Sequence, residues 1–217
     1  MNRPAIHPRA TISVVLAGCA VVLFVALFRF QSLGPLDFWW WMSLDIALLC
    51  GLALALDRSL LAAVRDDARS GGAQKAALGL IAAAALYGVF LLGRIVSTRL
   101  LPFAAEDIRA VYGLKAGASP LRIALLIAVV IGPGEELFWR GTLQRIWATR
   151  FGRVRGYLLA TLLYALVHLA TGNIMLIAAA AVGGLFWGYL YLRTDSVLIT
   201  AVSHTAWDLL VFMILPL

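Results

Sequence analysis

The stretch LRIALLIAVVIGPGEELFWRGTLQRI, residues 121–146, combines a long apolar run with ionisable side chains near its middle. A helix of about 20 mainly apolar residues spans a lipid bilayer, and this stretch is long enough to do so. Glu135, Glu136 and Arg140 lie well inside it. Each charge at the centre of a membrane helix costs about 2.5–3.5 kcal/mol, so these groups must be paired, hydrated or protonated. The stretch therefore predicts a membrane helix that carries a polar site.

The rest of the chain is equally apolar. Of its 217 residues, 63% are hydrophobic and 13% are charged, whereas a soluble domain is about one quarter charged. We expect a single all-α domain over residues 1–217, a polytopic membrane helix bundle of about seven transmembrane helices, with an additional interfacial helix near 104–115. The predicted spans are 11–28, 38–56, 76–96, 121–146, 156–170, 173–192 and 196–215.

The net charge of +7 does not indicate nucleic-acid binding, because the basic residues are scattered between apolar runs. Their clusters instead predict orientation, since loops rich in Lys and Arg stay in the cytoplasm. We expect the N-terminus to be cytoplasmic, and the Ala-, Leu- and Arg-rich composition favours a bacterial cytoplasmic membrane. The clusters that set this orientation are Arg3, Arg9, Arg58, Arg65, Arg69, Lys75, Arg145, Arg150, Arg153 and Arg155.

The two cysteines give no sign of a disulfide framework or a metal site. Cys19 and Cys50 each lie inside an apolar run, without the spacing of metal ligands. The first span, 11–28, is too long for most signal peptides and lacks a small-residue cleavage site, so we expect it to be retained. No cofactor is expected.

Further polar side chains lie at a similar depth in the later spans. His168 lies on the fifth span, and His204 and Asp208 are four residues apart on one face of the seventh. Counted from the ends that share one side of the membrane, Glu135, His168 and His204 lie roughly 15, 20 and 14 Å deep at 1.5 Å per residue. We therefore expect them to meet in one layer, while Glu136 and Arg140 form a salt bridge at four-residue spacing.

Such a group of residues predicts hydrolysis by an activated water. A carboxylate and an imidazole can bind and deprotonate a water molecule, and a second imidazole can stabilise an oxyanion. Ser203 is a weak candidate nucleophile, because adjacent residues on a helix point in different directions. Asp45 and Arg94, the other ionisable groups within spans, are expected to bond locally or to reach the surface.

Three motifs resemble those of the CPBP family of intramembrane proteases, which includes CAAX prenyl endopeptidases (Rce1) and bacterial bacteriocin-processing or self-immunity (Abi) proteins. They are Glu135-Glu136-x-x-x-Arg140, Tyr164-x-x-x-His168 and His204-x-x-x-Asp208. The resemblance covers about 108–215 as a protease core, and 1–100 corresponds to the family's variable N-terminal helices. The second motif usually begins with Phe rather than Tyr164, and the prenyl proteases have Asn where this chain has Asp208.

The resemblance implies a glutamate-dependent endopeptidase that acts on a membrane-associated peptide or protein. Its catalytic residues would be Glu135 as general base, His168 on the same water, and His204 and Asp208 near the scissile carbonyl. Glu136, Arg140 and Tyr164 would be supporting residues, with Glu136 and Arg140 holding Glu135 in place. An ionised Asp208 would repel an oxyanion, so it should orient and charge His204 or be protonated. Either glutamate could serve as the base.

Three alternatives to this hypothesis remain open on the sequence. One is a zinc-dependent, metalloendopeptidase-like membrane hydrolase with Glu135, His168 and His204 as ligands, although no HExxH motif occurs. A second is a non-catalytic membrane binding or immunity protein. A third is a proton-coupled transporter, which the lack of two symmetrical halves makes less attractive.

Overall fold

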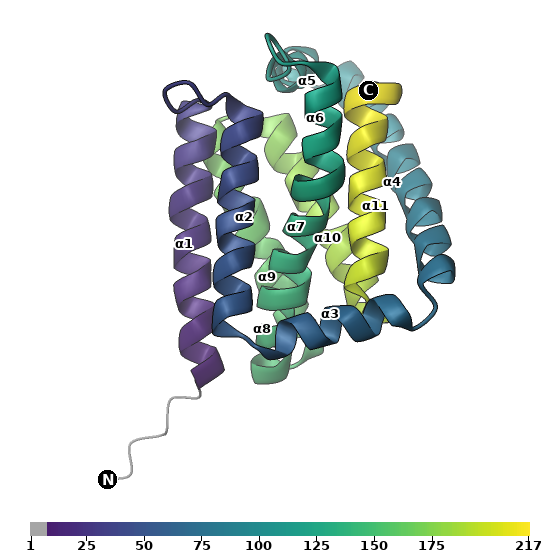
Figure 1. The fold of residues 1–217 in the computed structure, drawn as a ribbon. Coiled ribbons are helices and arrows are strands. Elements are labelled where there is room, and N and C mark those ends of the chain that lie inside the picture. The colour runs from purple at the N-terminus through teal and green to yellow at the C-terminus, as the bar shows by residue number, and fades with distance from the viewer. Residues whose placement is uncertain (1–7) are drawn as a thin grey trace.

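The computed structural model describes residues 8–217, with side chains from residue 11 onward, and consists of helices joined by short turns (Figure 1). Arg3, on which the predicted orientation partly depends, lies outside the described residues, as does the side chain of Arg9. Six helical segments are long and apolar enough to cross a membrane. They comprise α1 (Pro8–Phe30), α2 (Phe38–Leu56), α4 (Gly72–Leu100), α9 (Arg153–Val167) with its 3₁₀ extension His168–Thr171, α10 (Ile174–Thr194), and α11 (Val197–Leu209) with the π turn Leu210–Ile214.

A seventh membrane-length rod is built from successive short helical pieces. It carries four ionisable groups in its first twenty-one residues, which sets it apart from the purely apolar spans. Its pieces are α6 (Pro120–Leu126), the π turn Ile127–Ile131, α7 (Gly132–Phe138), the π turn Trp139–Gln144, and α8 (Arg145–Phe151). The predicted all-α polytopic bundle is confirmed, and the helices extend a few residues beyond several of the predicted limits.

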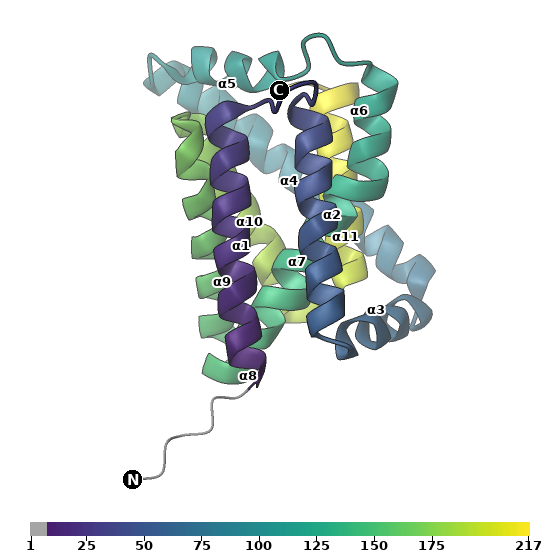
Figure 2. The same cartoon turned by 60° about the vertical axis from the view of Figure 1, so that its left-hand side comes forward.

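Two amphipathic helices lie across opposite ends of the bundle (Figures 1 and 2). The helix α5 (Ala104–Gly113) corresponds to the predicted interfacial helix. The helix α3 (Ser59–Arg69) was not predicted, because its few apolar residues sit among charged ones. A partly buried salt bridge between Asp57 and Arg145, 2.5 Å long, joins the α2–α3 turn to α8. A short helix therefore lies across each end of the bundle, α5 at one and α3 at the other.

The outer surface of the bundle is apolar, as a lipid environment requires. On α4, for example, Ile81 and Leu92 are 66% and 62% exposed. Soluble proteins rarely leave such large apolar areas uncovered. The exposed apolar side chains and the six membrane-length helices identify an integral membrane protein.

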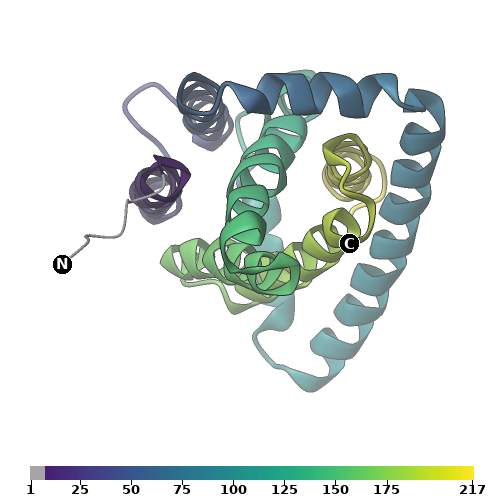
Figure 3. The same ribbon diagram turned by 90° about the horizontal axis from the view of Figure 1, so that it is seen from below.

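The helix α11 lies near the middle of the bundle, between α4 and the α6–α8 rod (Figure 3). Close approach depends on glycines. A Cβ on Gly79 would stand 2.9 Å from the carbonyl oxygen of Ile199, and one on Gly132 would stand 2.9 Å from the Cα of Thr205. These two glycines bring α4 and α7 against α11, which holds His204 and Asp208 next to the glutamates of α7.

Candidate active site

The glutamate pair lies on α7, a short α-helix between two π turns. Pro133 has no N–H to donate to the preceding turn and its ring crowds that turn, so the regular helix is interrupted there. The chain widens into a π turn at Ile127–Ile131 and again at Trp139–Gln144. Single π turns inside α-helices often mark functional sites. Here both carboxylates face the interior, with Glu135 2% and Glu136 0% exposed.

Glu136 is the centre of a buried ionic network. Its Oε1 accepts a hydrogen bond from Arg140 Nη1 at 2.7 Å, which forms the salt bridge expected from the four-residue spacing. The same oxygen lies 2.7 Å from Nδ1 of His204 on α11. Glu136 therefore neutralises Arg140 and fixes the orientation of His204. No hydrogen bond or ion pair links Glu136 to Glu135 in the described part of the chain, so the support given to Glu135 comes from another residue.

Arg140 is itself fully enclosed. Its Nη2 donates to the carbonyl oxygen of Gly184 on α10 at 3.3 Å. Its guanidinium lies over the ring of Tyr164, 5.2 Å from the centroid, and over that of Trp187 at 5.8 Å. A buried cation needs such compensation, because desolvation costs several kcal/mol. Arg140 thereby ties α10 and α9 to the glutamate pair.

Glu135 is oriented by Tyr164. The hydroxyl of Tyr164 donates a hydrogen bond of 2.9 Å to Glu135 Oε2. The same oxygen lies 3.8 Å from Nε2 of His204. The hydroxyl of Tyr164, by which the second motif differs from the usual Phe, thus contacts the site directly. Glu135 lines a cavity, whereas Glu136 is not among the residues that line it.

His204 stands between three carboxylates. Its Nδ1 faces Glu136, and its Nε2 lies 3.8 Å from Glu135 Oε2 and 3.7 Å from Asp208 Oδ2. The imidazole is stacked on Trp187, with ring centroids 3.6 Å apart and planes at 20°. This packing fixes the plane of the ring, and carboxylate oxygens lie near both of its nitrogens. Asp208 therefore faces the nitrogen that points into the cavity rather than the nitrogen that anchors the ring.

His168 reaches the same cavity from the end of α9. The helix tightens to a 3₁₀ turn at His168–Thr171 and ends at Gly172, which has φ of +65°. The Nδ1 of His168 lies 2.7 Å from the carbonyl oxygen of Tyr164, so Nδ1 carries a proton, and in the neutral imidazole Nε2 is an acceptor. Phe28 of α1 packs against the ring, with centroids 4.6 Å apart.

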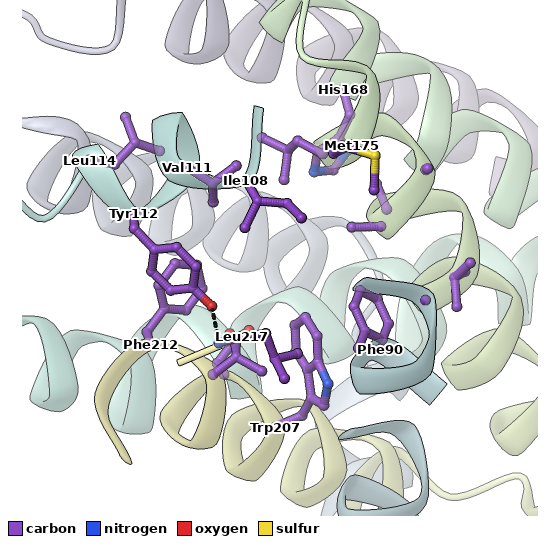
Figure 4. A pocket seen from close by; sticks show the side chains of 18 of the residues that line it. Phe90, Ile108, Val111, Tyr112, Leu114, His168, Met175, Trp207, Phe212 and Leu217 are labelled. Carbon is purple, nitrogen blue, oxygen red and sulfur yellow. Dashed lines mark hydrogen bonds between the residues drawn. The ribbon is translucent and has the colours of Figure 1, made fainter. Parts of the chain in front are cut away.

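The cavity has a volume of about 500 Å³ and extends from the carboxylates towards α5. Five of the polar side chains predicted from the sequence line it: Glu135, Tyr164, His168, His204 and Asp208. Figure 4 shows His168 and Met175 at one wall, with Phe90, Trp207 and Phe212 along another. The cavity thus offers the carboxylates and imidazoles a mainly apolar chamber that would accommodate an extended peptide or an apolar chain.

The zinc site considered as an alternative is not assembled. Among residues 8–217, no group of three or more His, Cys, Asp or Glu side chains has an arrangement that could hold a metal ion. His168 forms no ion pair with any carboxylate of the described chain. Ser203 is not among the residues that line the cavity, and its Oγ accepts a hydrogen bond of 3.2 Å from Trp187 Nε1, so it is not poised as a nucleophile.

Sequence reasoning did not identify Trp187, Gly184 or Phe28 as parts of the site. Trp187 and Gly184 contact the site because α10 packs against both α9 and α11. The residue pattern within α10 does not predict this packing. Phe28 belongs to the N-terminal helices, which were expected to vary independently of the core. The sequence has one relevant signal, the run of small residues around Gly184, and such a run is typical of close helix packing rather than of a site.

The fold and the cavity define an integral membrane protein with a buried acid–histidine site. Residues 117–210, which include all of these motif residues, match the Rce1-like family, described as type II CAAX prenyl endopeptidase Rce1-like. The match covers the part of the chain that carries the three motifs, and it confirms their resemblance to this family of membrane proteases. Neither the search of curated proteins nor the search of solved structures returned a match.

Proposed function

We propose that this chain is a glutamate-dependent intramembrane endopeptidase that hydrolyses a peptide bond of a membrane-associated peptide or protein. The observation that carries the proposal is the convergence of Glu135, Tyr164, His168, His204 and Asp208 on one cavity inside the bundle. The match of residues 117–210 to a protease family supports peptide hydrolysis in general. The geometry supports the particular assignment of roles that follows.

Glu135 is the general base in this mechanism. It lines the cavity and has one oxygen held by Tyr164, whereas Glu136 already accepts bonds from Arg140 and His204. Glu135 would take a proton from a water molecule, and the water oxygen would attack the carbonyl carbon of the substrate. The same proton would pass to the leaving amine as the C–N bond breaks, so the reaction needs no covalent intermediate.

The two histidines have different tasks. Nε2 of His168 is an acceptor and would hold the second hydrogen of the attacking water. His204, with Nδ1 anchored on Glu136, would present Nε2–H to the oxyanion that develops on the carbonyl oxygen. Asp208, 3.7 Å from that nitrogen, would keep His204 protonated before the substrate enters.

The proposal is tested by comparing membrane peptides from cells that carry the wild type, Glu135→Gln and Glu106→Gln. Glu106 is exposed on α5 and serves as a matched control. Mass spectrometry should find new peptide termini in the wild type and in the control that are absent from Glu135→Gln cells. Equal sets of termini in all three strains would contradict the proposal and favour a binding or immunity protein.

We further propose that the α3 end of the bundle faces the cytoplasm. The loops and helix ends on that side carry Arg58, Arg65, Arg69, Lys75, Arg145, Arg150, Arg153, Arg155 and Arg193. In this orientation the cavity would extend towards the non-cytoplasmic leaflet, beneath α5. A substrate would then enter from that side, which disfavours a cytosolic prenylated C-terminus.

Cysteine labelling tests the orientation. In a variant with Cys19 and Cys50 replaced by Ala, a single cysteine is introduced at Ser70, beside α3, or at Glu106 on α5; both positions are exposed. In intact spheroplasts a membrane-impermeant maleimide should label the α5 position and should reach the α3 position only after permeabilisation. The opposite pattern would invert the orientation without affecting the chemistry of the site.

A further inference from the structure

The cavity contains one permanent cation. Its lining is mainly apolar, and its charged members are Glu135 and Asp208 at the inner end and Arg94 on α4. From the sequence, Arg94 was expected to bond locally or to reach the surface. In the structure it is one of the residues that line the cavity. The side chain is exposed to this space rather than enclosed by protein.

The position of Arg94 relative to the carboxylates follows from the packing of α4 on α11. Phe90 packs on Trp207 with ring centroids 4.5 Å apart, and Trp207 is the residue before Asp208. Arg94 lies one helical turn beyond Phe90, about 6 Å further along α4. Figure 4 shows Phe90 and Trp207 on the cavity wall, with Tyr112 of α5 beyond them. Arg94 therefore lines the same cavity as the proposed catalytic residues, about one helical turn further along α4 than the point where α4 packs beside Asp208.

Arg94 has no acidic partner among the side chains that the structure describes. No ion pair involving its guanidinium occurs among residues 8–217, although Arg122, Arg140, Arg145 and Arg153 each pair with a carboxylate. An ionisable group inside a membrane span is costly and indicates a functional site. The two carboxylates of the chamber would also repel an anionic ligand unless a cation stood in the same space. Arg94 is suited to that compensation.

We propose that Arg94 binds a carboxylate of the substrate peptide and so determines which peptides are placed with their scissile bond at Glu135. The inference rests on the proposed protease function. The planar guanidinium forms two parallel hydrogen bonds with a carboxylate, which fixes both the position and the direction of the chain. The carboxylate is that of the peptide C-terminus or of an Asp or Glu side chain, and the experiment separates these sources.

The test uses proteoliposomes of phosphatidylcholine and internally quenched apolar peptides. Each peptide is made with a free C-terminal carboxylate or a C-terminal amide, and with Glu or Gln at an internal position. Cleavage is measured for the wild type, Arg94→Gln, Arg94→Lys and Arg99→Gln. Arg99 is an exposed residue of the same helix outside the cavity lining, and its variant should cleave as the wild type does.

The wild type should cleave one carboxylate-bearing peptide at least about tenfold more efficiently than its neutral counterpart, as expected for a charge-assisted hydrogen bond. Arg94→Gln should abolish this preference mainly through a higher KM, and Arg94→Lys should retain part of it. The proposal is overturned if Arg94→Gln preserves the wild-type ratio, or if its only effect appears when phosphatidylglycerol is added, which would assign Arg94 to lipid phosphate.

A binding measurement separates this inference from the protease assignment. In the Glu135→Gln background, anisotropy of fluorescent peptides should still show a preference for the carboxylate form, and adding Arg94→Gln should remove it. If Glu135→Gln proteoliposomes continue to cleave, the assigned catalytic base is wrong while the role of Arg94 stands. If binding in the Glu135→Gln background shows no carboxylate preference, the role of Arg94 is wrong.

Discussion

Nδ1 of His204 lies 2.7 Å from Oε1 of Glu136, the same oxygen that accepts a hydrogen bond of 2.7 Å from Arg140. One carboxylate oxygen thus fixes an imidazole on α11 and a guanidinium on its own helix. Because Nδ1 is occupied, the other ring nitrogen of His204 is directed to Glu135, 3.8 Å away. The two adjacent glutamates therefore lie beside different nitrogens of one imidazole. In the proposed mechanism Glu136 has a structural role and Glu135 is the general base.

This separation predicts different outcomes for the two glutamine variants. Glu136→Gln leaves Arg140 buried without its counter-ion, a change that typically costs about 3–5 kcal/mol. We expect it to lower both the thermal midpoint in detergent and the rate of cleavage. Glu135→Gln should abolish cleavage and change the free energy of unfolding by less than about 1 kcal/mol, since the amide oxygen can still accept a hydrogen bond from Tyr164. A stable and active Glu136→Gln protein would show that the ionic network is dispensable.

The hydroxyl of Tyr164 provides a second test. Tyr164→Phe restores the residue usual at this motif position and removes the 2.9 Å bond to Glu135. A hydrogen bond to a charged group contributes about 1.5–3 kcal/mol, so kcat should fall roughly tenfold to a hundredfold with little change in KM. Tyr189→Phe is the control. Tyr189 lies on α10 and is 52% exposed, so its variant should leave both constants unchanged. A changed KM with constant kcat would assign Tyr164 to substrate binding instead.

The sequence was sufficient to predict the bundle because bilayer-spanning helices need long apolar runs, and these can be read directly. It also indicated which polar residues share a layer, because depth follows from the helical rise along each span. The direction in which each side chain points could not be predicted from the sequence. Whether Glu135 or Glu136 faces the cavity depends on the π turns around Pro133, and the contact between Glu136 and His204 depends on how α11 packs against α7.

Amphipathic α3 was not predicted, and the role proposed here for Arg94 does not follow from the sequence, for a related reason. α3 carries Arg65, Asp66, Asp67 and Arg69 in its last turns, a pattern also typical of a solvated loop. Arg94 lies near the end of a predicted span, a position typical of an arginine whose side chain reaches the lipid headgroups. In both cases the position relative to other helices decides the role, and local spacing does not contain that information.

The contact between α7 and α11 predicts a strong effect of a single methyl group. In Gly132→Ala the new Cβ would stand 2.3 Å from Thr205 Oγ1 and 2.9 Å from Thr205 Cα, so α11 must shift. Overpacking of this kind costs about 1–3 kcal/mol, and it displaces the neighbouring His204. Thermal unfolding and cleavage should both decline. Gly88→Ala on α4 places its Cβ in open space and should match the wild type.

Asp67 links α3 to the start of the helix that carries His204, and this link should depend on pH. Its carboxylate accepts bonds from Lys75 Nζ at 2.7 Å and from the N–H of Leu198 at 2.9 Å. Burial raises the pKa of Asp67, but these bonds outweigh burial and hold the pKa below its ordinary value of 3.8. The ionised form is therefore favoured by folding.

A depressed pKa in the folded protein contributes stability above the pKa of the unfolded chain, and this contribution is lost as the pH falls through the folded value. Asp67→Asn should lower stability by about 1–3 kcal/mol at neutral pH. The difference in thermal midpoint between wild type and variant should stay constant from pH 7 to pH 5 and narrow towards pH 3. Asp66→Asn, at an exposed neighbouring position, should show no difference at any of these pH values. A gap that widens on acidification would mean that the neutral carboxyl, not the carboxylate, holds α3 against α11.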